Sequence, residues 1–170
     1  MNTRYNDGIY EGICVDGKTV VESSLLSNLY DTDYHLWVLE TVQFLENKAF
    51  NSLDLPNLIE EVVDLSRRDK RKLESLLTLV FEHLLKLKYW ESERVRNQGH
   101  WKAEILSFRK QIKKELKASP SLKPYLLNIW DECYQDGREI ASTRSLLPLD
   151  LFPEEPIADL NQVLDENWLP

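Results

Sequence analysis

The residue types most able to do chemistry stand in one stretch, residues 53–90. Glu60 and Asp64 are four residues apart, so both carboxylates lie on one face of any helix that forms there. Carboxylates on facing helices can hold two metal ions, but those sites also use a Glu-x-x-His pair, which the chain lacks. A solvated acidic face explains Glu60 and Asp64 better than a metal site does, and we predict no metal ligands.

His83 is the third member of this weak polar set, because histidine titrates near neutrality and suits general acid–base work. It stands among leucines, and no nucleophile signature such as G-x-S-x-G accompanies it. The five glycines match neither of the usual phosphate-binding fingerprints. We interpret His83 as a core or boundary side chain and predict no catalytic residue and no cofactor.

Two basic groups can contact phosphates if both face one side of the molecule. They comprise Arg67, Arg68, Lys70, Arg71, Arg109, Lys110, Lys113, Lys114 and Lys117. Residues 66–117 hold 15 Lys/Arg and 7 Asp/Glu, whereas the remainder holds 6 and 22. Either the acidic parts complement this basic zone internally, or the zone meets an anionic partner. The pI of about 5.0 argues against a dedicated nucleic-acid binder, for which a basic domain is usual.

The helix that positions these groups has an apolar stripe in two parts. Leu55, Ile59 and Val62 begin it, six charges within residues 66–72 interrupt it, and Leu73 resumes it. No Gly or Pro falls at the interruption, so residues 54–90 form either one helix or two end to end. We expect this stretch to supply much of the core.

Further helices are predicted over residues 30–48, 101–117 and 121–145, with residues 91–99 as a polar connection. Asp31 or Thr32 is the expected N-cap of the first. The helix at 101–117 is amphipathic, with the second basic group on its outer face. Residues 147–170 hold four of the seven prolines and several large apolar groups. We therefore expect this tail to wrap along the bundle, with a short helix between 158 and 166.

Together these elements predict an all-α fold, an antiparallel bundle of four or five helices. The scarcity of glycine agrees with it. Residues 30–170 are expected to form one domain. Residues 1–29 are expected to be an extension with a short β-hairpin at 9–22, around the turn pair Asp16-Gly17.

The expected location is the cytoplasm. Cys14 and Cys133 form no disulfide or metal-binding pattern. No apolar run reaches the roughly 20 residues that a membrane span needs, and the N-terminus does not resemble a signal peptide.

Several motifs occur in an order typical of one family. They are YDTDYHLWVLETVQFL at Tyr30, LDLPNLIEEVVDL at Leu53, KLESLLTLVFEHLLKLKYW at Lys72, HWKAEI at His100, SPSLKPYL at Ser119 and LPLDLFPEEP…LDENWLP at Leu147. Over residues 30–170 the chain resembles domain-of-unknown-function family 29, small bacterial proteins that are numerous in cyanobacteria. The resemblance implies a helical bundle and carries no activity. Gly99-His100 departs from the family, which often has arginine there.

These observations favour a non-enzymatic protein-interaction module, acting on a protein partner or on a second copy of itself. Binding of nucleic acid or another polyanion through the basic groups at 67–72 and 109–117 is the alternative. No membrane partner is expected.

Overall fold

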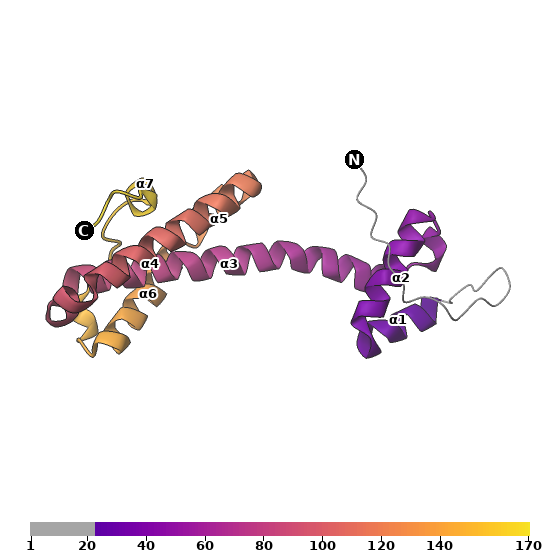
Figure 1. Cartoon of the computed structure of the whole chain (residues 1–170), viewed down its shortest axis with the longest axis horizontal. Coiled ribbons are helices and arrows are strands. Elements are labelled where there is room, and N and C mark those ends of the chain that lie inside the picture. The colour runs from indigo at the N-terminus through magenta and orange to yellow at the C-terminus, as the bar shows by residue number, and fades with distance from the viewer. Residues whose placement is uncertain (1–22) are drawn as a thin grey trace. The chain divides into compact units, whose positions relative to one another are not determined.

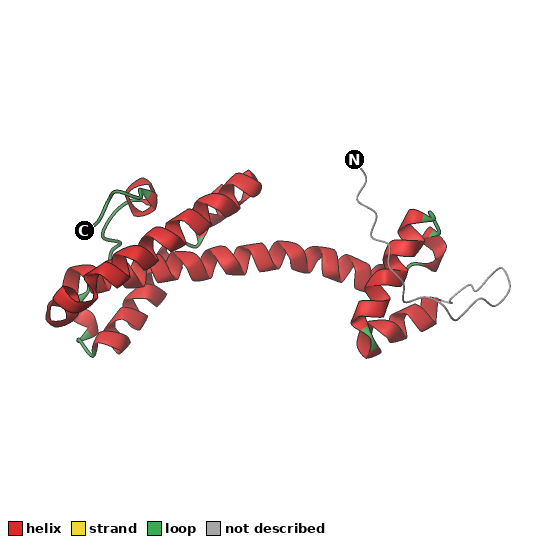
Figure 2. Ribbon diagram, viewed as in Figure 1, coloured by secondary structure: helices red, strands yellow, loops and turns green. Residues whose placement is uncertain are grey.

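The computed structural model describes residues 23–170, with side chains from residue 26 onward. All regular structure in that range is helical, in seven α-helices and three short 3₁₀ helices (Figures 1 and 2). The all-α prediction is therefore confirmed, and the predicted hairpin lies outside the described residues. The chain divides into two compact units, unit 1 (Met1–Val63) and unit 2 (Asp64–Pro170). The prediction that residues 30–170 form a single domain stays a prediction.

The described part of unit 1 begins with α1 (Ser23–Thr32) and α2 (Tyr34–Glu46), followed by a 3₁₀ turn at Phe50–Ser52. The prediction of a single helix over residues 30–48 is wrong at its start, because Asp33 interrupts the helix there. The backbone of Asp33 is not helical (φ −149°, ψ 79°), and its Oδ1 accepts a hydrogen bond from the Leu36 N–H at 3.0 Å. Asp33, rather than Asp31 or Thr32, is therefore the N-cap.

The helix α3 (Leu55–Tyr89) is one continuous element of 35 residues. The charged run at 66–72 does not end it, because Arg and Lys are good helix formers and nothing in the run breaks the backbone. Residues 55–63 belong to unit 1 and residues 64–89 to unit 2.

In unit 2, α4 (Glu91–Ala118) runs back along α3 (Figure 1). Only Trp90 separates the two helices, so the predicted polar connection at 91–99 is wrong and those residues are helical. Lys72 near the start of unit 2 donates to Glu115 near the end of α4, at 2.7 Å, which fixes the antiparallel arrangement.

The remaining helices complete the core against α3. These are the 3₁₀ turn Pro120–Leu122, α5 (Lys123–Asn128) and α6 (Trp130–Ser145). The predicted helix at 121–145 is thus divided at Ile129. Phe81 of α3 meets Trp130 and Tyr134 of α6 edge to face, with ring centroids 4.8 and 5.2 Å apart.

The tail wraps along unit 2 as predicted. It holds a 3₁₀ turn at Leu149–Leu151 and the short helix α7 (Leu160–Leu164). Phe152 and Val163 are buried in the core, and the guanidinium of Arg138 donates to the carbonyls of Leu149 and Phe152. The tail thus supplies apolar side chains that cover part of the core of unit 2.

Candidate interaction surface

Unit 1 is held together by a buried carboxylate. Asp54 is almost inaccessible, and its Oδ2 accepts hydrogen bonds from the Trp37 indole N–H at 3.3 Å and from the Asn57 amide at 2.7 Å. Trp37 is itself buried on the inner side of α2. The carboxylate therefore joins α2 to the start of α3, and these two hydrogen bonds offset the cost of its burial.

An aromatic cluster adds a second connection. Tyr30, Tyr34 and Trp37 have ring centroids 5.0 to 5.8 Å apart. The hydroxyls of Tyr30 and Tyr34 each donate to Glu61 of α3 at 2.9 Å. The hydrogen bond to this carboxylate, more than burial, raises the pKa of Tyr30 to about 12.

Unit 1 also exposes large apolar groups on α2, on α3 and on the 3₁₀ turn between them. The apolar surface of unit 1 comprises Tyr34, Leu39, Val42, Leu45, Phe50, Leu55, Ile59, Val62 and Val63. On α3, Ile59 and Val62 are 60% and 59% exposed. Leu55, Ile59 and Val62 are spaced as one helix face, so they form a stripe two turns long that nothing in the described residues covers. The expectation that these residues enter the core is wrong.

The sequence indicates the exposure of this stripe only indirectly. The stripe of Leu55, Ile59 and Val62 has the same spacing as the buried stripe from Leu73 onward, so periodicity alone cannot separate them. The charged run at 66–72 marks the place where the covering helices end. An apolar helix face with no helix predicted to lie against it is the feature that identifies an exposed stripe.

Several residues of the two predicted basic groups have partners within the chain. Arg67 pairs with Asp64 at 3.0 Å, and Lys113 pairs with Glu166 at 2.8 Å. The ammonium of Lys70 lies 4.9 Å from the centre of the Tyr125 ring. The side chains of Arg71, Lys110, Lys114 and Lys117 are exposed, and so is that of Arg68, which also takes part in an interaction within the chain. The internal complementarity considered for the basic zone is thus present in part.

Arg109 is not on the outer face where it was predicted. It is fully buried, its Nε donates to the Val163 carbonyl at 2.6 Å and its Nη1 to the Trp168 carbonyl at 2.8 Å. Burial lowers its pKa, against the opposing effect of Asp165 and Glu166. Arg109 therefore fastens the tail to α4. Its position, four residues after the buried Ile105, is the signal that places it on the inner face.

Glu60, Asp64 and His83 do not form a common site. Asp64 is occupied by Arg67, and Glu60 is exposed. His83 is buried, and its Nδ1 lies 2.8 Å from the Leu79 carbonyl, so that nitrogen carries the proton and donates. Burial lowers the pKa of His83, which favours the neutral ring and agrees with a core or boundary position.

Buried titratable groups in unit 2 serve packing. Glu82 is fully buried and accepts hydrogen bonds from Lys86 at 3.1 Å and from Arg144 at 2.7 Å, both on Oε1. The sequence reasoning missed this cluster, although the i, i+4 spacing of Glu82 and Lys86 indicates a pair. Burial raises the pKa of Cys133 to about 11, so the thiol stays protonated and unreactive at neutral pH.

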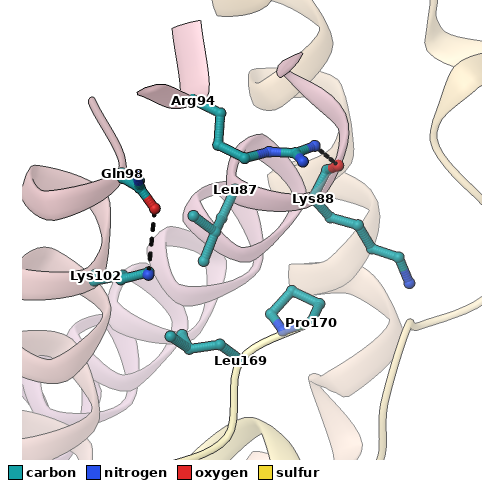
Figure 3. Close-up of a pocket in the computed structure, with 7 residues that line it drawn as sticks. All are labelled: Leu87, Lys88, Arg94, Gln98, Lys102, Leu169 and Pro170. Atoms are coloured by element: carbon teal, nitrogen blue, oxygen red, sulfur yellow. Dashed lines mark hydrogen bonds between the residues drawn. The ribbon is translucent and has the colours of Figure 1, made fainter. Parts of the chain in front are cut away.

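A cavity of about 280 Å³ lies where α3 and α4 meet the end of the chain (Figure 3). Leu87, Lys88, Arg94, Gln98, Lys102 and Leu169 line it. Its cations have partners within the chain: Arg94 donates to the Lys88 carbonyl, Lys102 donates to Gln98, and the Lys88 ammonium lies over the Tyr89 ring. They do not converge on a ligand position.

Within residues 23–170, no group of three or more His, Cys, Asp or Glu side chains is arranged to hold a metal ion. In the same range no helix is both long enough and apolar enough to cross a bilayer.

The geometry thus defines an all-α bundle protein with one well-packed unit and one unit that exposes apolar helix faces. Residues 29–169 match the family model described as domain of unknown function DUF29, and the chain belongs to that family. The family has no established function, so it carries no activity to this chain. No curated protein and no solved structure matches the chain significantly.

Proposed function

We propose that this protein is a non-enzymatic interaction module whose contact region is the apolar surface of unit 1. The observation that carries the proposal is the exposure of nine large apolar side chains within residues 34–63. Contiguous exposed apolar groups are uncommon on monomeric proteins and mark places where another surface binds. The cytoplasmic location expected from the sequence and the cyanobacterial origin that the family resemblance implies stay predictions.

The contacts inside unit 1 support this proposal. The Asp54 carboxylate and the aromatic cluster connect α2 to α3 on their inner sides. The helices that carry the exposed apolar groups are therefore held in place by contacts within unit 1. A surface that is ordered before binding loses less conformational entropy when a partner docks, which favours affinity.

Position-specific photo-crosslinking in the native host tests the proposal. A photoreactive phenylalanine analogue replaces Ile59 or Val42 in unit 1, or Leu127 in unit 2, which is exposed to a similar degree. We expect a crosslinked species of defined mass from Ile59 or Val42 and none from Leu127. Equal crosslinking at all three positions, or none at Ile59 and Val42, would overturn the proposal.

Polyanion binding by the outer face of α4 is the second candidate, supported by the exposure of Lys110, Lys114 and Lys117. Reversing the charge at Lys110, Lys113 and Lys114 tests it. Binding to single-stranded DNA or heparin should then weaken and lose its salt dependence. Binding that ignores these changes removes this candidate.

A further inference from the structure

The tail, residues 147–170, is bound to the helices of unit 2 through its backbone carbonyls. Tyr134 of α6 donates to the Pro153 carbonyl at 2.8 Å, and Arg138 donates to two others. On α4, Arg109 donates to two carbonyls near the end of the tail. Contacts to main-chain groups are typical of the way in which proteins bind extended peptides. The tail-binding surface of unit 2 comprises Arg109, Lys113, Tyr134, Gln135 and Arg138.

Two apolar anchors complete this binding. Phe152 and Val163 are buried in the core of unit 2, and the Phe152 ring lies against Tyr89 at the end of α3, with ring centroids 5.5 Å apart. Between Phe152 and α7 the tail is irregular (Figure 2). The tail is therefore a segment that binds to the helices at a few points and is not part of any of the long ones.

A single residue sets the direction in which the tail leaves α6. Leu146 has left-handed backbone (φ 58°, ψ 19°), which leucine adopts at a cost because of its Cβ. Leu147 precedes a proline, so its backbone is restricted to extended conformations, and Pro148 is extended as well (φ −62°, ψ 144°). Rotation of Leu146 alone, from left-handed to extended backbone, would turn the tail away from its own helices and relieve that cost.

Two hydrogen bonds oppose this rotation. Ser142 Oγ donates to the Leu147 carbonyl at 2.7 Å, and the Leu147 N–H donates to Ser145 Oγ at 3.3 Å. Both lie next to Leu146, which is 91% exposed, so water can replace them when the turn opens. Opening the turn therefore loses little, provided that the tail finds its other contacts elsewhere.

The region around this turn also exposes apolar side chains. Leu146, Leu149 and Leu151 lie close together in sequence, and all three are exposed. In two chains that exchange tails about a two-fold axis, the two turns come next to each other, and these leucines can cover one another. Such a pair would bury apolar surface that a single chain leaves in water.

We propose that two copies of this chain exchange their tails. Residues 147–170 of one copy bind the tail-binding surface of the other, and Leu146 is the hinge. The contacts of the tail beyond the hinge are the same in the exchanged pair, so its stability relative to two single chains depends on the hinge and on concentration. The inference goes beyond the proposed function, because it concerns unit 2 and does not use the apolar surface of unit 1.

A second copy is the partner that the tail-binding surface fits. Its tail carries the same two apolar anchors at the same spacing, and its Glu166 is placed to pair with Lys113 as it does within one chain. A peptide from another protein would have to match both anchors and present carbonyls at the same intervals. A second copy meets all of these conditions without any change in sequence.

The test determines which chain supplies the tail, using two ion pairs of the native protein. Equal amounts of unlabelled and isotope-labelled full chain are unfolded together, refolded at millimolar concentration and separated by size. A carbodiimide then joins ammonium and carboxylate groups that are in contact, without a spacer. The pair of Lys113 and Glu166, at 2.8 Å, reports on the tail. The pair of Lys72 and Glu115, at 2.7 Å between α3 and α4, is the matched control.

We expect light scattering to show a species of twice the 20.0 kDa mass of the chain. In that species, about half of the crosslinks between Lys113 and Glu166 should join a labelled chain to an unlabelled one, through random pairing. Crosslinks between Lys72 and Glu115 should come from one chain only. In the species of single mass, neither pair should join two chains.

Variants of the hinge test its role. Leu146→Gly should raise the dissociation constant of the pair at least about fivefold, because glycine relieves the single chain of its strained backbone and both copies carry the change. Leu146→Ile should lower that constant about fivefold, because a β-branched residue tolerates positive φ less well than leucine does. Lys48→Gly makes the same kind of change in unit 1, at φ 55°, and should alter the constant by less than about 1.5-fold.

Three results would overturn the inference. A chain that keeps its single mass after refolding at millimolar concentration does not exchange tails. A species of double mass in which Lys113 and Glu166 are joined only within one chain associates through another surface. Equal effects of Leu146→Gly and Lys48→Gly show that Leu146 is not the hinge. None of these results concerns the apolar surface of unit 1, which crosslinking at Ile59 and Val42 tests separately.

Discussion

The two units treat their apolar side chains in opposite ways. Among the described residues, unit 2 has 19 buried hydrophobic residues and seven large ones exposed, whereas unit 1 has three buried and nine exposed. Both units take part of α3, and the apolar spacing is alike in both parts. The difference therefore comes from what covers the helix, since α4, α5, α6 and the tail all belong to unit 2.

This difference shows that amphipathic periodicity identifies the apolar face of a helix but does not show whether other elements bury that face. In unit 2 the cover is within the chain, and the unit is stabilised by it. In unit 1 hydrogen bonds to Asp54 and Glu61 connect α1 and α2 to the start of α3. A unit held by few buried apolar groups is expected to have a low local stability.

The largest effect should come from truncating matched apolar residues in the two units. Leu77 is fully buried in the core of unit 2, and Ile59 is exposed in unit 1. Leu77→Ala should lower the free energy of unfolding by about 3 kcal/mol, through lost burial and a cavity. Ile59→Ala should change it by no more than about 0.5 kcal/mol. Urea denaturation followed by circular dichroism measures both, and similar losses would contradict the difference between the units.

A smaller effect should come from the close approach of α6 to α3 at Gly137. A Cβ added at Gly137 would lie 2.8 Å from the Phe81 Cβ and 2.9 Å from the Thr78 carbonyl oxygen. Because both are fixed on α3, Gly137→Ala must push α6 away and should cost about 2 kcal/mol.

The same substitution at Gly99 is the control for Gly137→Ala. Nothing lies within 4 Å of a Cβ added there, and the position is helical. Gly99→Ala should therefore stabilise α4 by about 0.5–1 kcal/mol. If thermal unfolding shows the same sign for both substitutions, the close packing of α6 on α3 is wrong.

A still smaller effect, a gain, is expected from relieving left-handed backbone in each unit. Leu146 ends α6 with φ 58° and is 91% exposed, and Lys48 follows α2 with φ 55°. Glycine adopts this region without the Cβ penalty, so Leu146→Gly and Lys48→Gly should each stabilise their own unit by about 0.5–1 kcal/mol. Hydrogen exchange resolved by residue should show protection rising in the unit that carries the change. A uniform rise throughout the chain would show that the two units unfold together.

The helix content and several helix boundaries were predictable, because they depend on local spacing and caps. The start of α3 after Asp54 and the end of α6 at Ser145 follow from such signals. Local reasoning failed where burial decides. Arginine is usually a surface residue, yet the spacing of Arg109 from Ile105 places it against the tail. There its guanidinium donates hydrogen bonds to carbonyls of the tail.

The candidate surface was the least predictable feature, because exposure depends on which elements lie beside a helix. The stripe of Leu55, Ile59 and Val62 was expected in the core, and only the arrangement of the other helices shows that it is uncovered. Contacts between residues distant in sequence carry this information, and helical periodicity does not contain it.

The ionisation of two tyrosines distinguishes the units by the cause of the shift. The pKa of both Tyr30 and Tyr134 is raised to about 12, in Tyr30 first by the hydrogen bond to Glu61 and in Tyr134 first by burial. Glu61→Ala should therefore return the pKa of Tyr30 toward 10 and leave Tyr134 near 12, as measured by NMR titration of ring-labelled tyrosine. A Tyr30 pKa that stays near 12 in this variant would show that burial, rather than the carboxylate, dominates in unit 1 as well.

The raised pKa of these tyrosines also makes the stability of the fold depend on pH. Because the folded chain keeps the hydroxyl protons of Tyr30 and Tyr134 above pH 10 and an unfolded tyrosine does not, their contribution to stability is full below pH 10. It is lost as the pH rises from 10 toward 12.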